Sequence, residues 1–331
     1  MLTVQNLKVS YRSRKRTVPV LSSVSLQAGA DELVTLVGRN GAGKTTLLRS
    51  IVGLLKPDEG SVQLNGMELL RQDRRMLARM VSYVSTDMVY NPVMTVYDLV
   101  ALGRHPHTSW LGRLEKTDRD SISRAITLTH MERFISSPVS ELSDGERQRA
   151  LIARALAQDT RLLIMDEPAA FLDVVNRYEI MMMLRTLCRE EGKTVILSTH
   201  DLSLALHESD NIWLLLPGTC MQGAPEDLVL QDAFAALFEG SRAHIDTASG
   251  EVLPGHLPGK KVQVTGEGLA MDWTIRALDR MGYRAIAEPA PFSIEVSRNN
   301  NTFTWTLQKS KKQLTFKSIY ELSLLLRNER F

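Results

Sequence analysis

The stretch ELVTLVGRNGAGKTTLLRSIVGLL (residues 32–55) joins a short apolar run, a glycine-rich loop and a helix-forming segment without a break. Its centre fits the pattern G-x-x-x-x-G-K-[ST]. The glycines let backbone N–H groups approach phosphate oxygens, while Lys44 neutralises the β- and γ-phosphates and the Thr45 hydroxyl ligates Mg²⁺. We therefore predict a phosphate loop at the end of a buried strand. We assign the nucleotide contacts of this loop to Gly38, Asn40, Gly41, Ala42, Gly43, Lys44, Thr45 and Thr46.

Two more apolar runs end in residues that suit phosphate chemistry. LLIM (162–165) is followed by Asp166 and Glu167, and VILST (195–199) is followed by His200. A carboxylate at the C-terminal end of such a strand faces the ligand crevice of an open α/β sheet, so Asp166 can hold Mg²⁺. Glu167 can act as general base on the attacking water, and His200 can bond the γ-phosphate. Taken alone, the acidic pair could be a solvated turn and the histidine a structural residue.

The order of these segments predicts an α/β fold. Apolar strands that alternate with helices indicate a largely parallel sheet covered on both faces. We expect one α/β domain that carries the phosphate loop over residues 1–246 and a Gly- and Pro-rich linker over 247–261. Residues 262–331 then predict a small α+β domain with the element order βαβββα.

A second candidate anion site lies far from the phosphate loop. Ser143, Asp144 and Gly145 come directly before a long amphipathic run, as at the start of a helix. A helix start presents free N–H groups and the positive end of the helix dipole, which together suit an anion. The phosphate loop is already a complete phosphate-binding site, so a second anion site in the same chain needs another explanation.

The chain resembles the ATP-binding subunits of ABC transporters over roughly residues 1–245. The resemblance rests on five stretches in the order and spacing of that family, namely GRNGAGKTT (38–46), LSDGERQR (142–149), LLIMDEP (162–168), AFLD (170–173) and LSTHD (197–201). It implies a P-loop NTPase fold of the ABC type, with a mixed sheet core and a helical subdomain over about residues 88–158. It also implies ATP and Mg²⁺ as ligands, and ATP hydrolysis as the activity.

The resemblance explains the second anion site through a partner copy. Family members form head-to-tail homodimers in which each ATP lies between the phosphate loop of one subunit and the LSDGE helix start of the other. By this likeness Ser143 and Gly145 contact the γ-phosphate in trans, Asp173 reaches across the interface, and Tyr11 stacks on adenine. Tyr11 could equally be a half-buried strand residue.

One position departs from the family pattern. After the strand VSYV (81–84) the family usually carries a glutamine that senses Mg²⁺ and the γ-phosphate, whereas this chain has Thr86, flanked by Ser85 and Asp87. A threonine hydroxyl could still meet a metal-bound water. We therefore expect Thr86 or Asp87 to keep a weaker form of this role.

The stretch MTVYDLVALGRHPHTSWLGRL (94–114) looks like the helical subdomain of importers for iron–siderophore, haem or cobalamin uptake. That likeness implies integral membrane permease subunits as partners, with a permease helix docked beside this segment. A separate-chain ABC exporter and a soluble non-transport ABC ATPase stay open as alternatives. The C-terminal domain is either an accessory spacer or dimer-stabilising domain, or a regulatory binding module.

Composition limits the remaining function classes. The 331 residues are 44% hydrophobic and 24% charged, with a net charge of +2, which gives no electrostatic argument for nucleic acid as a partner. The first residues lack the apolar segment of a secretory signal, and apolar runs fall short of the about 18 residues of a membrane helix. We expect a peripheral protein at the cytoplasmic face of the cell membrane.

Overall fold

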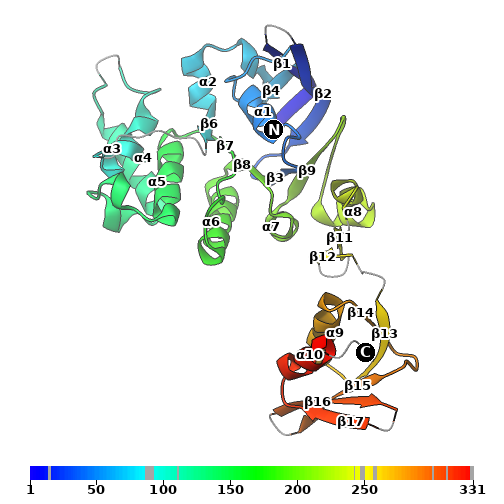
Figure 1. Ribbon diagram of the computed structural model, residues 1–331. Helices are drawn as coiled ribbons and strands as arrows, with labels where there is room; N and C mark the ends of the chain where they lie inside the picture. The colour runs from blue at the N-terminus through cyan, green and yellow to red at the C-terminus, as the bar shows by residue number, and fades with distance from the viewer. Residues whose placement is uncertain are drawn as a thin grey trace. The chain divides into compact units, whose positions relative to one another are not determined.

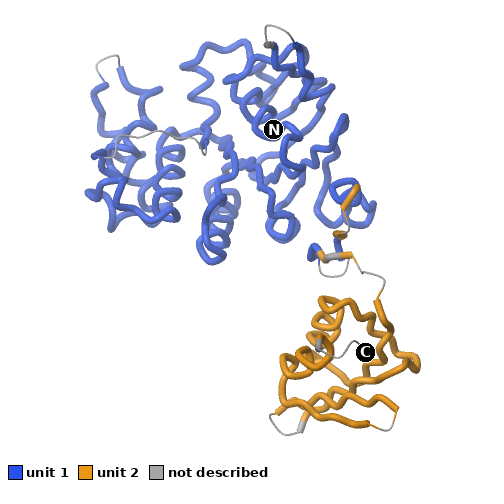
Figure 2. The backbone as a smooth tube through the Cα atoms, in the orientation of Figure 1, with its two compact units in different colours: residues 1–239, 245–252 blue, residues 240–244, 253–331 orange. Residues whose placement is uncertain are grey.

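The computed structural model describes residues 1–13, 16–85, 93–109, 112–241, 243–246, 250–255, 259–299, 302–310 and 312–328. Two compact units make up the chain (Figure 2). The N-terminal unit comprises residues 1–239 and 245–252, and the C-terminal unit comprises residues 240–244 and 253–331. Each unit has its own apolar cores, so each is described by itself.

A six-stranded sheet with the order β10-β9-β3-β8-β7-β6 forms the centre of the N-terminal unit (Figure 1). Five strands run parallel, and β10 pairs antiparallel with β9 at one edge. The predicted α/β class with a mixed sheet is confirmed. The strands are β3 (Leu33–Gly38), β6 (Val81–Val84), β7 (Leu162–Met165), β8 (Thr194–Thr199), β9 (Asn211–Leu216) and β10 (Thr219–Gly223).

The two faces of this sheet pack against different helices, because successive side chains of a strand point to opposite faces. Val34, Ile164 and Ile196 share an apolar core with α1 (Lys44–Ile51). Their neighbours Leu33, Leu163 and Val195 belong instead to the core of α5 (Asp144–Ala157) and α6 (Val174–Glu191). The start of α1 and the start of α5 therefore belong to opposite sides of the central sheet.

A second sheet contributes to the core on the α1 side. Its strand order is β2-β1-β4-β5. Leu2, Val4 and Leu7 of β1 are buried in the same apolar core as α1. The short η1 (Leu69–Arg71) and α2 (Arg74–Met80) follow this sheet and lead into β6. The strands are β1 (Leu2–Ser13), β2 (Arg16–Ala28), β4 (Glu59–Leu64) and β5 (Met67–Glu68).

Residues between β6 and β7 form a helical segment in which α5 packs against α3 and α4 (Figure 1). Reciprocal capping boxes lie at the starts of α3, α4 and α5, namely Thr95 with Asp98, Glu115 with Asp118 and Ser143 with Glu146. The other elements of the segment are α3 (Val96–Ala101), η2 (Leu102–Arg104), α4 (Lys116–Leu128), η3 (Glu132–Phe134) and η4 (Val139–Glu141).

The last part of the N-terminal unit packs on β9 through Ile212 and Leu214. Its elements are α7 (Leu202–Glu208), α8 (Pro225–Leu230) and η5 (Ala233–Phe238). β11 (Ala243–Ile245) and β12 (Val252–Pro254) then form a separate two-stranded sheet. None of the helices in the described part of the chain combines the length and apolar character that a bilayer span requires.

The C-terminal unit is a five-stranded sheet, β14-β13-β15-β16-β17, with α9 and α10 packed in its core. The observed order is βαββββα. The expected order βαβββα lacked one strand, β14, which follows α9 directly. Gly282, with φ 80°, lets the chain leave the helix and pair parallel with β13. The elements are β13 (Lys260–Thr265), α9 (Leu269–Arg280), β14 (Tyr283–Ile286), β15 (Ser293–Asn299), β16 (Thr302–Lys309), β17 (Lys312–Phe316) and α10 (Ile319–Asn328).

Candidate functional site

The phosphate loop connects β3 to α1, as its sequence predicts. Gly41 and Gly43 adopt left-handed backbone angles, with φ of 82° and 103°. A Cβ atom on Gly38 would lie 2.6 Å from the carbonyl oxygen of Leu215 on the neighbouring strand. On Gly41 a Cβ atom would meet nothing within 4 Å. The loop is thus folded tightly against the sheet at Gly38 and open at Gly41, where a phosphate could approach the backbone.

Lys44 is a buried cation at the first residue of α1. The residue is 7% exposed, and its ammonium group donates a hydrogen bond to the carbonyl oxygen of Gly38 at 2.9 Å. Burial lowers the pKa of Lys44, while the carboxylates of Glu167 and Asp166 act in the opposite direction. The buried ammonium group and the helix start can pair with the negative charge of a polyphosphate, and the two carboxylates can pair with Mg²⁺.

Asp166 lies directly after β7 and is 4% exposed. Its carboxylate accepts a hydrogen bond from Ser198 Oγ at 2.7 Å, and Tyr83 Oη donates to its second oxygen at 3.5 Å. Burial and the Asp166 charge together raise the pKa of Tyr83, so Tyr83 is a neutral donor here. Together with the Thr45 hydroxyl, this carboxylate supplies the hard oxygen ligands that Mg²⁺ prefers, so the residues fit the ion.

Glu167 and His200 meet at the ends of two parallel strands. His200 Nδ1 lies 3.6 Å from Glu167 Oε2, and both side chains remain accessible to solvent. Glu167 has a left-handed φ of 48°, and its N–H donates to Ser198 Oγ at 2.9 Å. Such backbone angles cost energy in a non-glycine residue and are frequent at functional sites. The structure thus brings the expected base and the expected γ-phosphate ligand together.

Ser198 is a site residue that the sequence did not single out. It is fully buried and bonds both the Asp166 carboxylate and the Glu167 backbone. The only available signal was a polar residue inside the apolar run VILST. Tyr11 is half exposed, and its hydroxyl lies 3.2 Å from Thr46 Oγ1 beside the phosphate loop. Adenine stacking on Tyr11 stays a prediction.

Ser143, Gly145 and Asp173 form a second group, at the starts of α5 and α6. Asp173 accepts two bonds from Asn176, at 2.8 Å from its N–H and 2.7 Å from its amide group. A Cβ atom on Gly145 would lie 2.7 Å from Oδ1 of the same Asn176, so a glycine lets the two helix starts approach. Because α5 and α1 pack on opposite sides of the central sheet, this group and the phosphate loop belong to different faces of one subunit.

Thr86 and Asp87, the expected substitutes for the family glutamine, lie outside the described residues. A metal-binding group of three or more His, Cys, Asp and Glu side chains does not occur among the described residues. This finding is compatible with a Mg²⁺ site, because that ion is commonly held by one or two carboxylates together with substrate phosphates.

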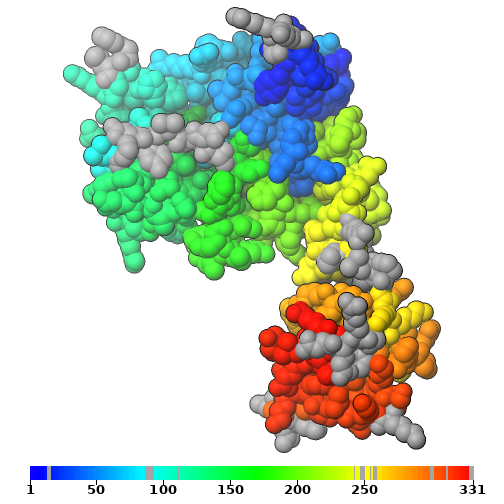
Figure 3. All heavy atoms as spheres, in the orientation of Figure 1, coloured from blue at the N-terminus to red at the C-terminus, as the bar shows by residue number. Residues whose placement is uncertain are grey.

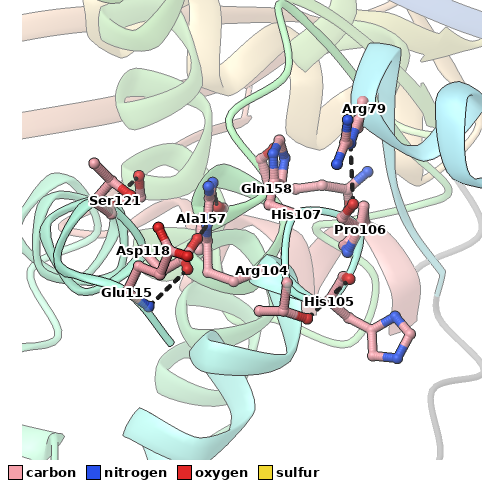
Figure 4. A network of polar contacts seen from close by, with 12 residues as sticks. Arg79, Arg104, His105, Pro106, His107, Glu115, Asp118, Ser121, Ala157 and Gln158 are labelled. Atoms are coloured by element: carbon pink, nitrogen blue, oxygen red, sulfur yellow. Dashed lines mark hydrogen bonds and ion pairs between the residues drawn. The ribbon is translucent and has the colours of Figure 1, made fainter. Parts of the chain in front are cut away.

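A polar network fastens the helical segment to its surroundings (Figure 4). Arg104 pairs with Asp118 at 2.8 Å, and both side chains are 7% exposed. Arg104 also donates to the carbonyl of Ala157, and His107 Nε2 lies 2.9 Å from the carbonyl oxygen of Gln158. Arg75 and Arg79 of α2 donate to the carbonyl of Pro106. The network joins α2, α4 and the end of α5.

Comparisons with known proteins agree with this geometry. The sequence profile of the ABC transporter family matches residues 21–170, and that of the iron ABC transporter C-terminal domain matches residues 259–327. The petrobactin import ATP-binding protein FpuC of Bacillus anthracis is 37% identical over 232 residues, which are 70% of this chain and 85% of that protein. The iron(3+)-hydroxamate import ATP-binding protein FhuC of Bacillus subtilis is 32% identical over 72% of this chain and 87% of its own length.

Solved structures show the same fold. The dimeric structure of MJ0796, a bacterial ABC transporter cassette, is 27% identical with a TM-score of 0.60, over 68% of this chain and 99% of that one. A second structure of MJ0796 is a dimeric post-hydrolysis state bound to ADP and Pi, with the same identity and TM-score. On its motifs, its fold and these relatives, the chain belongs to the family of ABC transporter ATP-binding subunits.

Proposed function

We propose that this protein is the ATP-hydrolysing subunit of an ABC importer that serves an iron–siderophore, haem or cobalamin type of substrate. Relatives such as FpuC and FhuC are import proteins for petrobactin and iron(3+)-hydroxamate, and a relative from Halobacterium salinarum is a cobalamin import protein. The match of residues 259–327 to the iron ABC transporter C-terminal domain supports the iron branch. The observation that carries the ATPase assignment is the grouping of Lys44, Asp166, Glu167 and His200 at the C-terminal ends of the parallel strands.

Each residue at these strand ends has a separate role in ATP hydrolysis. ATP enters with its phosphates on the phosphate loop, where Lys44 neutralises the β- and γ-phosphates. Asp166 and Thr45 would hold Mg²⁺, which supplies charge neutralisation at the transferred phosphoryl group when it is bound. Glu167 orients the attacking water and accepts its proton, and His200 bonds the γ-phosphate. Ser198 keeps the Asp166 carboxylate and the Glu167 backbone in place.

A complete site requires a second copy of the chain. In a head-to-tail dimer, Ser143 and Gly145 of the partner subunit would reach the γ-phosphate that rests on the phosphate loop. Dimeric cassettes such as MJ0796 support this arrangement. The packing of α1 and α5 on opposite sides of the sheet supports it as well, because one subunit cannot easily supply both halves. Permease subunits in the membrane would then hold the protein at the cytoplasmic face.

Growth on defined nutrients tests the importer assignment. The gene is deleted in its own organism, and growth is measured with ferric siderophore, haem or cobalamin as the limiting nutrient. We expect the loss of growth on one of these substrates. The intact gene should restore growth, and the Glu167→Gln variant should not. Unchanged growth on all three substrates would contradict the importer assignment while leaving the ATPase assignment standing.

A further inference from the structure

Tyr83 is a second side-chain donor to the carboxylate of Asp166. It lies on β6, in the parallel register that pairs Tyr83 with Ile164 of β7. The backbone N–H of Asp166 donates to the carbonyl of Val84 at 2.9 Å, so the ends of the two strands are bonded to each other beside this contact. Ser198 donates to Oδ1 of the carboxylate and Tyr83 donates to Oδ2. Each carboxylate oxygen therefore has its own donor.

The two bonds differ in length. The bond from Ser198 Oγ measures 2.7 Å, whereas the bond from Tyr83 Oη measures 3.5 Å and is longer than the usual distance of about 2.7–2.8 Å between such oxygens. The Oδ2 atom is thus the less tightly held of the two. Asp166 is only 4% exposed, so these two donors, and not bulk water, decide how its carboxylate is oriented.

The Tyr83 hydroxyl also accepts hydrogen bonds. Burial and the Asp166 charge raise the pKa of Tyr83. Hydrogen bonds from the side chains of Arg49 and Ser85 act on this pKa in the opposite direction. A hydrogen bond that lowers the pKa of a phenol is one that the phenol oxygen accepts. The neutral hydroxyl therefore accepts from Arg49 and Ser85 and donates its proton to the carboxylate.

Arg49 connects this hydroxyl to the helix that begins at the phosphate loop. It follows Thr45 by four residues on α1, so the two side chains lie one turn apart on one face of the helix. The ring of Tyr83 packs against the same apolar core as α1. The side chain of Tyr83 thus contacts α1, the residue after β7 and the residue after β6, which are three separate parts of the chain.

We propose that Tyr83 is a positioning residue of the Mg²⁺ site, and that its hydroxyl sets the orientation of the Asp166 carboxylate. This inference rests on the proposed function, in which Asp166 and Thr45 hold the ion. Groups that hydrogen-bond to a metal-ligating carboxylate fix its direction, and their loss weakens metal binding. Tyr83 acts through Asp166. Ser85 acts one bond further away, because it holds the hydroxyl that holds the carboxylate.

The effect of Mg²⁺ on ATP affinity tests this role without turnover. All chains carry Glu167→Gln, which slows hydrolysis, and this chain is the parent. The ATP dissociation constant is measured in EDTA and again with Mg²⁺, and the ratio of the first constant to the second reports how well the protein holds the ion. We expect Tyr83→Phe, which keeps the ring, to lower this ratio about three- to tenfold. ATP affinity in EDTA should stay near that of the parent, because the phosphate loop is unchanged.

Tyr283→Phe is the matched control for the loss of a tyrosine hydroxyl. Tyr283 donates to the carbonyl of Leu326 at 3.3 Å within the C-terminal unit, which is mostly orange and red in Figure 3. The ratio for this variant should equal that of the parent. Asp166→Asn gives the opposite limit, because it alters the carboxylate itself and should remove most of the effect of Mg²⁺ on ATP affinity.

Ser85→Ala provides a second variant that leaves the tyrosine intact. We expect it to lower the ratio about twofold, in the same direction as Tyr83→Phe. Combining Ser85→Ala with Tyr83→Phe should give the ratio of Tyr83→Phe alone, because Ser85 acts through the hydroxyl that is already lost. Effects that add in the double variant would overturn the proposed connection through Tyr83.

The outcomes separate this proposal from the proposed function. Equal ratios for Tyr83→Phe and Tyr283→Phe, with the Mg²⁺ effect lost in Asp166→Asn, would overturn the role of Tyr83 and leave the proposed function intact. Tyr83→Phe that weakens ATP binding equally in EDTA and in Mg²⁺ would show a general structural role and would also overturn the proposal. An Mg²⁺ effect that Asp166→Asn leaves unchanged would overturn both, because Asp166 would then not hold the ion.

Discussion

The buried hydroxyl of Ser198 bonds to both acidic residues of the site. It donates to Asp166 and accepts from the backbone of Glu167, whose left-handed conformation it helps to hold. This single side chain therefore fixes both the carboxylate that we propose as a Mg²⁺ ligand and the backbone of the residue that we propose as the general base.

Ser198→Ala should remove both bonds and leave two buried polar groups without this partner. We expect kcat to fall about tenfold or more, with little change in ATP affinity, since the nucleotide contacts on the phosphate loop remain. The free energy of unfolding should fall by about 1–3 kcal/mol. Hydrogen exchange at the Glu167 amide should become faster. Ser82→Ala, at an equally buried serine of β6 that bonds Thr160, is the control and should leave kcat near wild type.

Glu167→Gln should remove the general base and keep the shape of the side chain. We expect ATP turnover to fall about 10²- to 10⁴-fold, while ATP still binds and accumulates in a dimer. Single-turnover hydrolysis with light scattering on the same sample measures both effects. Full turnover in this variant would contradict the assignment of Glu167 as the base.

The residues of the site that could be predicted from sequence are those that end apolar strands. Asp166, Glu167 and His200 were expected for this reason and Lys44 from the glycine-rich pattern before it, and the structure places the four side chains together. Ser198 could not be found in this way, because it lies within a strand and its role depends on which strand is its neighbour.

At the scale of elements, the helical segment depends on one buried ion pair between η2 and α4. Burial opposes ionisation of Asp118, yet the Glu115 backbone N–H and the Arg104 guanidinium hold the pKa of Asp118 below its usual value. A depressed carboxyl pKa stabilises the folded state above the unfolded pKa of about 3.9. That contribution disappears as the pH falls through the folded pKa.

Asp118→Asn should therefore destabilise the protein most at neutral pH. Breaking one partner of a buried pair costs about 3–5 kcal/mol. We expect urea unfolding at pH 7 to show a loss of this order, and the difference from wild type to shrink in acid below about pH 4. Glu59→Gln, in the exposed pair with Lys8, should cost less than about 1 kcal/mol. A loss for Asp118→Asn that stays constant from pH 7 to pH 3 would contradict this account.

Element prediction succeeded where periodicity was strong and failed where a strand was short. The strand–loop–helix at residues 32–55 and the strands before Asp166 and His200 follow from continuous apolar runs. β14 has four residues and is the strand that the expected order βαβββα leaves out. Only its pairing with β13 makes it a strand, and that pairing is a tertiary contact.

At the scale of the whole molecule, the two units have separate apolar cores. A chain shortened after residue 255 should therefore keep ATP binding and the main unfolding transition of the N-terminal unit. Calorimetry and nucleotide titration of the shortened chain check this expectation. Loss of ATP binding on shortening would show that the N-terminal unit depends on the C-terminal unit.

A site divided between two copies is the central claim about the molecule. The sequence suggested it through two anion sites in one chain, and the structure supports it by packing α1 and α5 on opposite sides of one sheet. Neither observation shows the second copy, whose contribution is a property of the assembly.

Ser143→Arg tests this claim most directly, because Ser143 lies at the start of α5 and outside the phosphate loop of its own subunit. ATP affinity and the rate of hydrolysis are measured on the same preparation. We predict ATP binding close to wild type, through residues 38–46, and turnover reduced to background. Turnover near wild type in this variant would contradict a site completed by a second copy.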